Sequence, residues 1–137
     1  APDISGVTPD GQVKSLSSFE GQVVFVDLWA TWCGPCVREV PFAIELQRQL
    51  KGRSLVFLNI SIDRKSEDWL RYLESHPTWA GVHLRITRQE DDSFRKNYGI
   101  HGVPVYMIID QQGKIVSTHA PRPSKPELKS LLLSLVE

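Results

Sequence analysis

Apolar residues fall into continuous runs that alternate along the chain with segments of helical pattern. The runs that begin at Val23, Leu55 and Val105 are rich in β-branched residues and have the length of strands buried on both faces. Helical patterns cover 34–50, a stretch around Trp69 and residues 91–98. The chain therefore alternates between buried strands and helices.

Shorter elements complete this pattern at the two ends of the chain. A Thr-Pro-Asp-Gly turn signal inside 4–14 predicts a β-hairpin, and 15–19 has the pattern of a short helical turn. Short strands are expected at 82–86 and 114–118. Ser124 is a suitable cap for a final helix, whose core-facing side would carry Leu128, Leu131, Leu132 and Leu135.

Both cysteines of the protein lie at one junction between a strand and a helix. The free N–H groups at a helix start favour a thiolate, so Cys33 is expected to have a lowered pKa and to be the exposed nucleophile. Pro35 suits the first helical turn because it has no N–H to leave unpaired. Cys36 lies one turn away on the same face, within reach of the Cys33 sulfur. The pair can therefore cycle between dithiol and disulfide.

Two other uses of the cysteine pair are disfavoured. A structural disulfide with so small a ring would constrain little of the unfolded chain. Half of a zinc site would need a second CXXC, which the chain lacks, and the histidines are scattered without ligand spacing. We therefore expect redox chemistry and no metal site.

Asp27 is a carboxylic acid inside an otherwise apolar strand. Its neighbours are apolar, so the side chain is expected to point into the interior, where burial raises the pKa of a carboxyl. Such a group could exchange a proton with Cys36, directly or through a water. The alternative is a strand-end aspartate that only accepts a backbone hydrogen bond.

Composition limits the remaining possibilities. The 137 residues are 41% hydrophobic, which fits one domain over 1–137. Sixteen basic and sixteen acidic residues cancel, so we expect neither a nucleic acid nor an anionic membrane as partner. The chain starts like a mature sequence, with no signal peptide or apolar span. One CXXC does not by itself distinguish the cytoplasm from the cell envelope.

Four motifs carry a resemblance to a known family. Residues 26–36, VDLWATWCGPC, resemble the active-site segment of thioredoxin-fold proteins. The opening pattern D-G…S-L…F-x-G, the later Y-G-I-x-G-V-P and the I-I-D-x-x-G that follows it resemble the TlpA/ResA/DsbE-like, redoxin-related reductases. The resemblance implies an α/β thioredoxin-like fold. Its central mixed sheet would be flanked by helices, with an N-terminal hairpin and an inserted helix within 63–89.

The resemblance also implies roles for single residues. Asp27 matches the buried acid of thioredoxin, although envelope reductases often lack it. Glu39 matches a glutamate that sets thiol pKa values in ResA-like reductases; in isolation it would be a solvated helix residue. Pro104 matches the family's cis-proline, whereas most X-Pro bonds are trans. The substrate would contact Val103 and Pro104, together with Trp32, Gly34 and Pro35.

The function that follows is thiol–disulfide oxidoreduction without a cofactor. Cys33 would attack a disulfide of a substrate protein, and Cys36 would resolve the mixed disulfide. We expect a monomeric reductant in the cell envelope or periplasm, supplied with electrons by a membrane protein; a cytoplasmic location stays open. One alternative is a peroxiredoxin-type peroxidase, although the P-x-x-x-T-x-x-C pattern is missing. The other is a non-enzymatic copper-binding thiol module, although the chain has one methionine.

Overall fold

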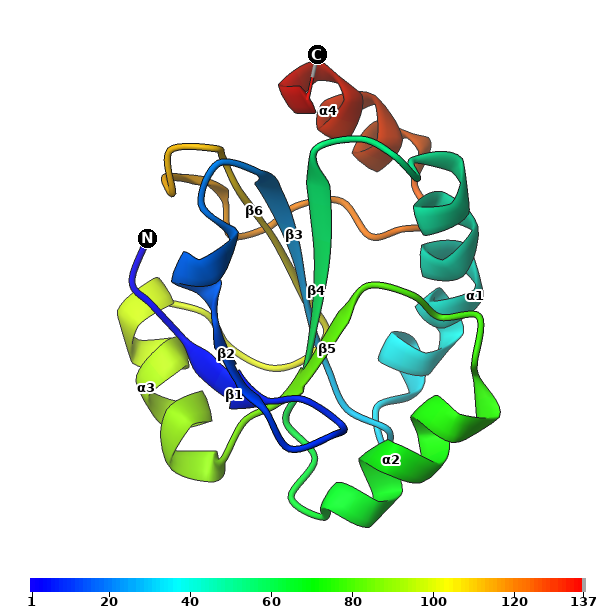
Figure 1. Ribbon diagram of the computed structural model, residues 1–137, viewed down its shortest axis with the longest axis vertical. Coiled ribbons are helices and arrows are strands. Elements are labelled where there is room, and N and C mark those ends of the chain that lie inside the picture. Colours follow the sequence, from blue (N-terminus) through cyan, green and yellow to red (C-terminus); the bar gives the residue numbers. More distant parts are fainter. Residues whose placement is uncertain (137) are drawn as a thin grey trace.

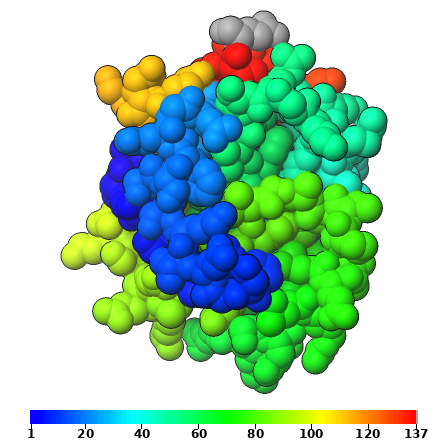
Figure 2. Space-filling view, in the orientation of Figure 1, coloured from blue at the N-terminus to red at the C-terminus, as the bar shows by residue number. Residues whose placement is uncertain are grey.

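In the computed structural model, which describes residues 1–136, seven strands form one mixed sheet in the order β2-β1-β5-β4-β3-β6-β7. Going along the chain, these strands are β1 (Ser5–Val7), β2 (Val13–Ser15), β3 (Val23–Trp29), β4 (Leu55–Ser61), β5 (Val82–Arg85), β6 (Val105–Ile109) and β7 (Ile115–Ser117). The mixed sheet and the N-terminal hairpin agree with the prediction. Figure 2 shows this hairpin, in blue, on the face toward the viewer.

Strand β3 is the centre of the sheet. All seven of its residues are buried, as the continuous apolar run predicts. It pairs in parallel with β4 and antiparallel with β6, and Leu28 of β3 faces Val105 at the start of β6. The end of β3 therefore lies beside the end of β4 and the beginning of β6.

Helices cover both faces of the sheet (Figure 1). Alternate residues of β3 point to opposite faces, so Val24 packs in one core cluster with Phe94, and Phe25 packs in another with Leu46 and Leu128. One face thus carries α3, and the other carries α1, α2 and α4. The bounds of the helices are α1 (Gly34–Gln49), α2 (Ser66–Ser75), α3 (Arg88–Tyr98) and α4 (Pro126–Val136).

Most predicted elements are confirmed, including the 3₁₀ helix Leu16–Phe19 and α2 as the inserted helix. Helix α3 differs, because it starts three residues before the predicted Asp91. The Thr87 hydroxyl accepts from the Glu90 N–H, and the Glu90 carboxylate accepts from the Thr87 N–H. This capping box starts the helix at Arg88 and brings Glu90 and Asp91 into its first turn.

Among residues 1–136, no helix has both the length and the apolar character that crossing a bilayer requires.

Candidate active site

The cysteine pair forms the N-terminus of α1. Cys33 is the N-cap residue and is disulfide-bonded to Cys36, with 5.3 Å between their Cα atoms. The backbone N–H of Cys36 donates to the Sγ of Cys33 at 3.2 Å, and Pro35 lies in the first turn. The predicted junction of strand, cysteine pair and helix is therefore confirmed, and one free N–H of the helix start points at sulfur.

The prediction that Cys33 is exposed is wrong for this disulfide-bonded form. Cys33 is 6% exposed and Cys36 is 3% exposed. Both pack in one cluster with Trp29 and other buried aromatic side chains, including Trp69 of α2 and Trp79. Trp69 of the inserted helix thus belongs to the same buried cluster as the disulfide, whereas Trp32, Gly34 and Pro35 beside the cysteines are exposed.

Asp63, which the sequence analysis did not single out, holds the turn before the cysteines. Its buried carboxylate accepts from the Thr31 N–H at 3.1 Å, from the Thr31 hydroxyl at 2.7 Å and from the Ser61 hydroxyl at 2.6 Å. Asp63 is the second residue after β4, and the carboxyl ends of β3 and β4 meet at one edge of the sheet. A polar residue at the end of the second buried strand was the available signal.

The loop before β6 reaches the same place. The Val103–Pro104 peptide bond is cis, as the resemblance implies. Because Leu28 faces Val105, Pro104 lies next to the end of β3 and the cysteine turn. The side chain of Val103 packs against the cluster that contains the disulfide. The structure thus brings together the residues predicted to contact the substrate.

Asp27 lies beneath α1, on the same face of β3 as Phe25 and Trp29. It is 5% exposed, and its side-chain carboxylate accepts no hydrogen bond from any of residues 1–136. Burial, with a smaller effect of the nearby Glu39 charge, raises the pKa of Asp27 to about 7. Tyr106 faces Asp27 across the β3–β6 pair, and burial raises its pKa as well. The prediction of a buried, perturbed carboxyl is confirmed.

Glu39 makes a contact that the sequence did not reveal. Its carboxylate accepts from the N–H and from the hydroxyl of Ser124, both at 2.8 Å, and lies 3.5 Å from the Nε of Arg122. Glu39 is therefore not a solvated helix residue: it ties α1 to the segment before α4. The expectation that Ser124 caps the last helix is wrong, because this hydroxyl donates to Glu39 and α4 begins at Pro126.

Two hollows lie beside the cysteine pair. One, of about 480 Å³, is lined by Pro35, Arg38, Glu39, Phe42, Pro104 and Arg122. The other, of about 580 Å³, is lined by Trp32, Ile62, Asp63, Arg64, Lys65, Asp68, Arg88, Asp91 and Asp92. In the part of the chain that the structure describes, no group of three or more His, Cys, Asp and Glu side chains is arranged to hold a metal ion.

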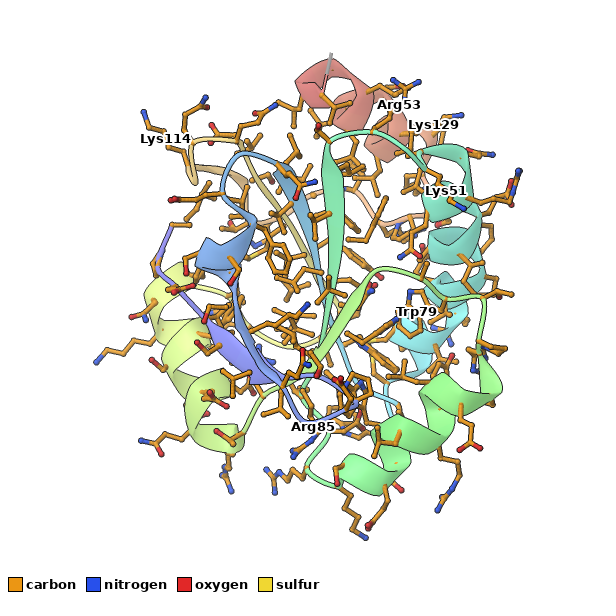
Figure 3. The ribbon with its side chains drawn as sticks, viewed as in Figure 1. Lys51, Arg53, Trp79, Arg85, Lys114 and Lys129 are labelled. Atoms are coloured by element: carbon orange, nitrogen blue, oxygen red, sulfur yellow. A yellow bond between two sulfur atoms is a disulfide. The ribbon has the colours of Figure 1, made fainter. Side chains whose placement is uncertain are left out.

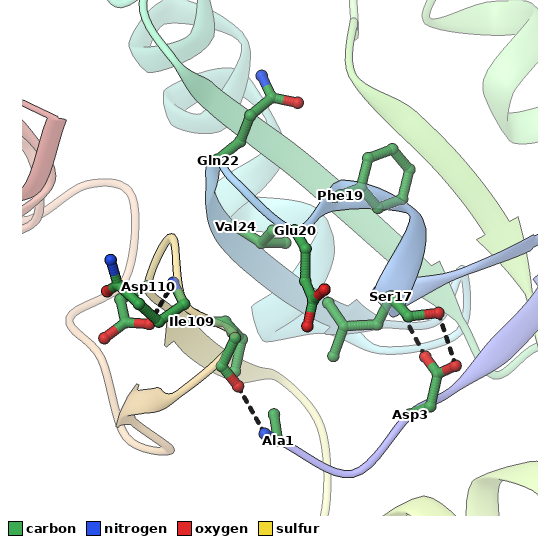
Figure 4. Close-up of a pocket in the computed structure, with 12 residues that line it drawn as sticks. Ala1, Asp3, Ser17, Phe19, Glu20, Gln22, Val24, Ile109 and Asp110 are labelled. Atoms are coloured by element: carbon green, nitrogen blue, oxygen red, sulfur yellow. Dashed lines mark hydrogen bonds between the residues drawn. The ribbon is translucent and has the colours of Figure 1, made fainter.

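A third hollow, of about 140 Å³, lies at the other end of β3 (Figure 4). It is lined by Val24 near the start of β3, by the 3₁₀ helix and by the turn after β6. The Asp3 carboxylate accepts hydrogen bonds from Ser17 at its rim. None of the predicted site residues lines it, so we assign the chemistry to the cysteine end of the strand.

The raised pKa of Asp27 predicts a pH-dependent effect of Asp27→Asn on stability. An aspartate that binds its proton more tightly when folded costs stability as the pH rises from about 4 to about 7. In the oxidised protein, where the cysteines do not titrate, we expect the stability advantage of Asp27→Asn to grow by about 2–3 kcal/mol between pH 5 and pH 9. Chemical unfolding at both pH values measures it. Asp92→Asn, at an exposed position, controls for loss of one negative charge, and equal changes in both variants contradict the assignment.

The contacts of Glu39 allow its docking role to be separated from an effect on the cysteines. Ser124→Ala loses a hydrogen bond to the Glu39 carboxylate, so its free energy of unfolding should be about 1–2 kcal/mol below that of the wild type. Glu39→Gln should lower the free energy of unfolding by a similar amount. In a Cys36→Ser background, only Glu39→Gln should speed alkylation of Cys33 at neutral pH, because only it removes a negative charge. Equal alkylation rates in the two variants would show that Glu39 only holds the segment before α4 and does not affect the reactivity of Cys33.

Comparison with known proteins agrees with this site. The chain is similar to the thioredoxin-like protein YneN of Bacillus subtilis, with 28% identity over 134 residues that cover 96% of this chain and 76% of YneN. It is 26% identical to the thiol–disulfide oxidoreductase ResA of Geobacillus thermodenitrificans, over 98% of this chain and 75% of ResA.

Structural comparison extends the similarity to the whole fold. The crystal structure of the thioredoxin domain of a thiol–disulfide oxidoreductase from Bacteroides vulgatus superposes with a TM-score of 0.89 at 27% identity, covering 100% of this chain and 95% of that chain. The predicted thioredoxin-like fold is confirmed. With the Cys33–Cys36 disulfide at its helix start, the protein is a thiol–disulfide oxidoreductase. The model of the redoxin family matches residues 1–132, and the chain therefore belongs to the redoxin family.

Proposed function

We propose that this protein reduces disulfide bonds of other proteins in the bacterial cell envelope, as a monomeric single domain without a cofactor. The observation that carries the proposal is the position of Cys33 as the N-cap of α1, where its sulfur accepts a hydrogen bond from the Cys36 N–H. A helix start favours the thiolate, which is the attacking form of cysteine.

The first step uses the reduced protein. The Cys33 thiolate attacks one sulfur of the substrate disulfide, the substrate S–S bond breaks, and the second substrate sulfur leaves as a thiolate. A mixed disulfide now joins Cys33 to the substrate. The N–H of Cys36 lies beside the Cys33 sulfur and favours the thiolate before attack.

The second step releases the substrate. The Asp27 carboxylate accepts the proton of Cys36, directly or through a water, and the Cys36 thiolate attacks the Cys33 sulfur. The mixed disulfide breaks, the Cys33–Cys36 disulfide forms, and the substrate sulfur that was bound to Cys33 leaves as a thiolate. The substrate has then gained two electrons; one of its thiolates takes the proton from Asp27 and the other takes a proton from water, which gives two thiols. A carboxyl with a pKa of about 7 has both protonation states available near neutral pH, which suits it to this transfer.

The substrate would lie across the exposed rim of the cysteine turn. Trp32 is 67% exposed, and Gly34 and Pro35 are also exposed, so a polypeptide can contact them. Val103 and Pro104 are half-buried beside the same turn, and we assign them the backbone contact with the substrate. Recognition would thus use the surfaces immediately around the disulfide.

The direction of electron flow follows from the charges around the cysteines. Thioredoxin, which shares the Gly-Pro pair, has a potential of about −270 mV, against about −120 mV for the oxidant DsbA. The buried carboxyls Asp27 and Glu39 disfavour a further negative charge on sulfur, which opposes strong stabilisation of the dithiol form. We assign the protein a reducing role, with a membrane protein as its electron donor.

Trapping of the mixed disulfide tests the roles of the two cysteines. We expect Cys36→Ser to accumulate a covalent complex with a disulfide-bearing protein, because the resolving thiol is missing and Cys33 can still attack. Cys33→Ser is the matched control and should accumulate none. Nonreducing gel electrophoresis followed by mass spectrometry of the joined peptides measures this. A complex formed through Cys36 in Cys33→Ser would reverse the assignment.

Equilibration with glutathione tests the direction. We expect a potential nearer to that of thioredoxin, about −270 mV, than to that of DsbA. Asp27→Asn combined with Glu39→Gln should make the potential less negative, because removal of the negative charge that these carboxyls carry favours thiolate and hence the reduced protein. Alkylation of the free thiols at each glutathione ratio gives the reduced fraction. A wild-type potential near −120 mV would identify an oxidant.

A further inference from the structure

The 480 Å³ hollow beside the cysteine pair combines an apolar floor with cationic side chains. Pro35 and Pro104 bring it next to the disulfide, and Phe42 of α1 is 51% exposed within it. Two arginines also line it, Arg38 from α1 and Arg122 from the segment before α4. A large exposed aromatic ring beside two guanidinium groups is the composition of a surface that binds polypeptide.

Arg38 is available to a partner. It is exposed, and within residues 1–136 no carboxylate pairs with it. Its Nη1 atom lies 3.3 Å from the position that a Cβ on Gly34 would occupy, so the guanidinium lies over the cysteine turn itself. The positive charge is therefore next to the place where the substrate's cysteine must lie.

Arg122 is only partly engaged. Its Nε lies 3.5 Å from the Glu39 carboxylate and donates to the Ser124 hydroxyl at 3.2 Å, and its side chain is 53% exposed. That carboxylate already accepts two hydrogen bonds from Ser124. Within the described residues, the terminal Nη atoms of Arg122 have no acceptor, so they can bind a second carboxylate.

The hollow on the Trp32 side carries charges of both signs close together. Its lining contains four carboxylates and three cationic side chains, whereas the hollow at Phe42 contains two arginines and one buried carboxylate. The chain as a whole has no net charge. The hollow at Phe42 therefore carries an excess of positive charge that the overall composition does not supply.

We propose that the groove formed by Arg38, Phe42 and Arg122 selects disulfides flanked by an acidic peptide segment. The guanidinium groups bind a carboxylate close to the substrate's cysteine, and Phe42 packs against an apolar side chain of the same segment. The proposal rests on the proposed reduction of protein disulfides and adds the class of substrate.

Two disulfide-linked peptides that differ only by Glu or Gln beside the cysteine test this selection. The measured quantity is the ratio of their rates of reduction by the reduced protein, divided by the same ratio for dithiothreitol, which corrects for intrinsic reactivity. We expect the wild type to favour the Glu peptide about three- to tenfold at low ionic strength, and this preference to fall toward one in 1 M salt.

Variants assign the preference to the groove. Arg38→Gln should lower it about two- to fivefold, and Arg38→Lys should retain most of it, because the charge is kept. Arg122→Gln should act in the same direction. Lys114→Gln is the matched loss of one cation, in the turn between β6 and β7 and far from α1 (Figure 3), and should leave the preference unchanged.

The outcomes separate this proposal from the proposed function. Equal corrected rates for the Glu and Gln peptides would contradict selection by the groove. So would a preference that persists when Arg38→Gln and Arg122→Gln are combined. Neither result would contradict the proposed reduction of disulfides. Reduction of neither peptide by the reduced protein overturns the proposed function and the groove with it.

Discussion

The pairing of β3 with both β4 and β6 is the constraint on which the site depends. The register sets the end of β3 beside the start of β6 and the end of β4. Three chain segments distant in sequence therefore converge: the cysteine turn, the loop with Pro104 and the turn held by Asp63. Complete burial of β3 fixes this register, because a shift by one residue would turn its side chains to the wrong faces.

Two buried carboxyl groups, Asp27 and Glu39, lie near the cysteines. Asp27 lies without a hydrogen-bond donor among the described residues, and nearby Glu39 adds a charge of the same sign. Replacement of such a group by a neutral one tends to stabilise a fold, so a fold selected for stability alone would favour its loss. Glu39 differs, because its contacts with Ser124 also hold the segment before α4.

The sequence predicted the local features and missed the contacts between distant segments. The apolar runs, the turn signals and the CXXC at a helix start each depend on neighbouring residues, and the structure confirms them. Three features join segments far apart in the chain: the hydrogen bonds of Asp63 with Thr31, those of Glu39 with Ser124, and the buried cluster that holds both the disulfide and Trp69 of α2. The spacing of apolar and polar residues along the chain does not predict such contacts. The low exposure of Cys33 likewise depends on a cluster whose members come from distant segments. The capping box of α3 is different, since Thr87 and Glu90 were visible in the sequence.

The two edge strands of the sheet affect how readily another extended chain can pair with it. Both edge strands, β2 and β7, contain three residues, and β6–β7 carries a register irregularity. An edge so short exposes few backbone groups, so it is a poor template for an added strand. An extended polypeptide would therefore gain few main-chain hydrogen bonds by adding to either edge. The same short edges offer two copies of the chain few backbone groups to pair through.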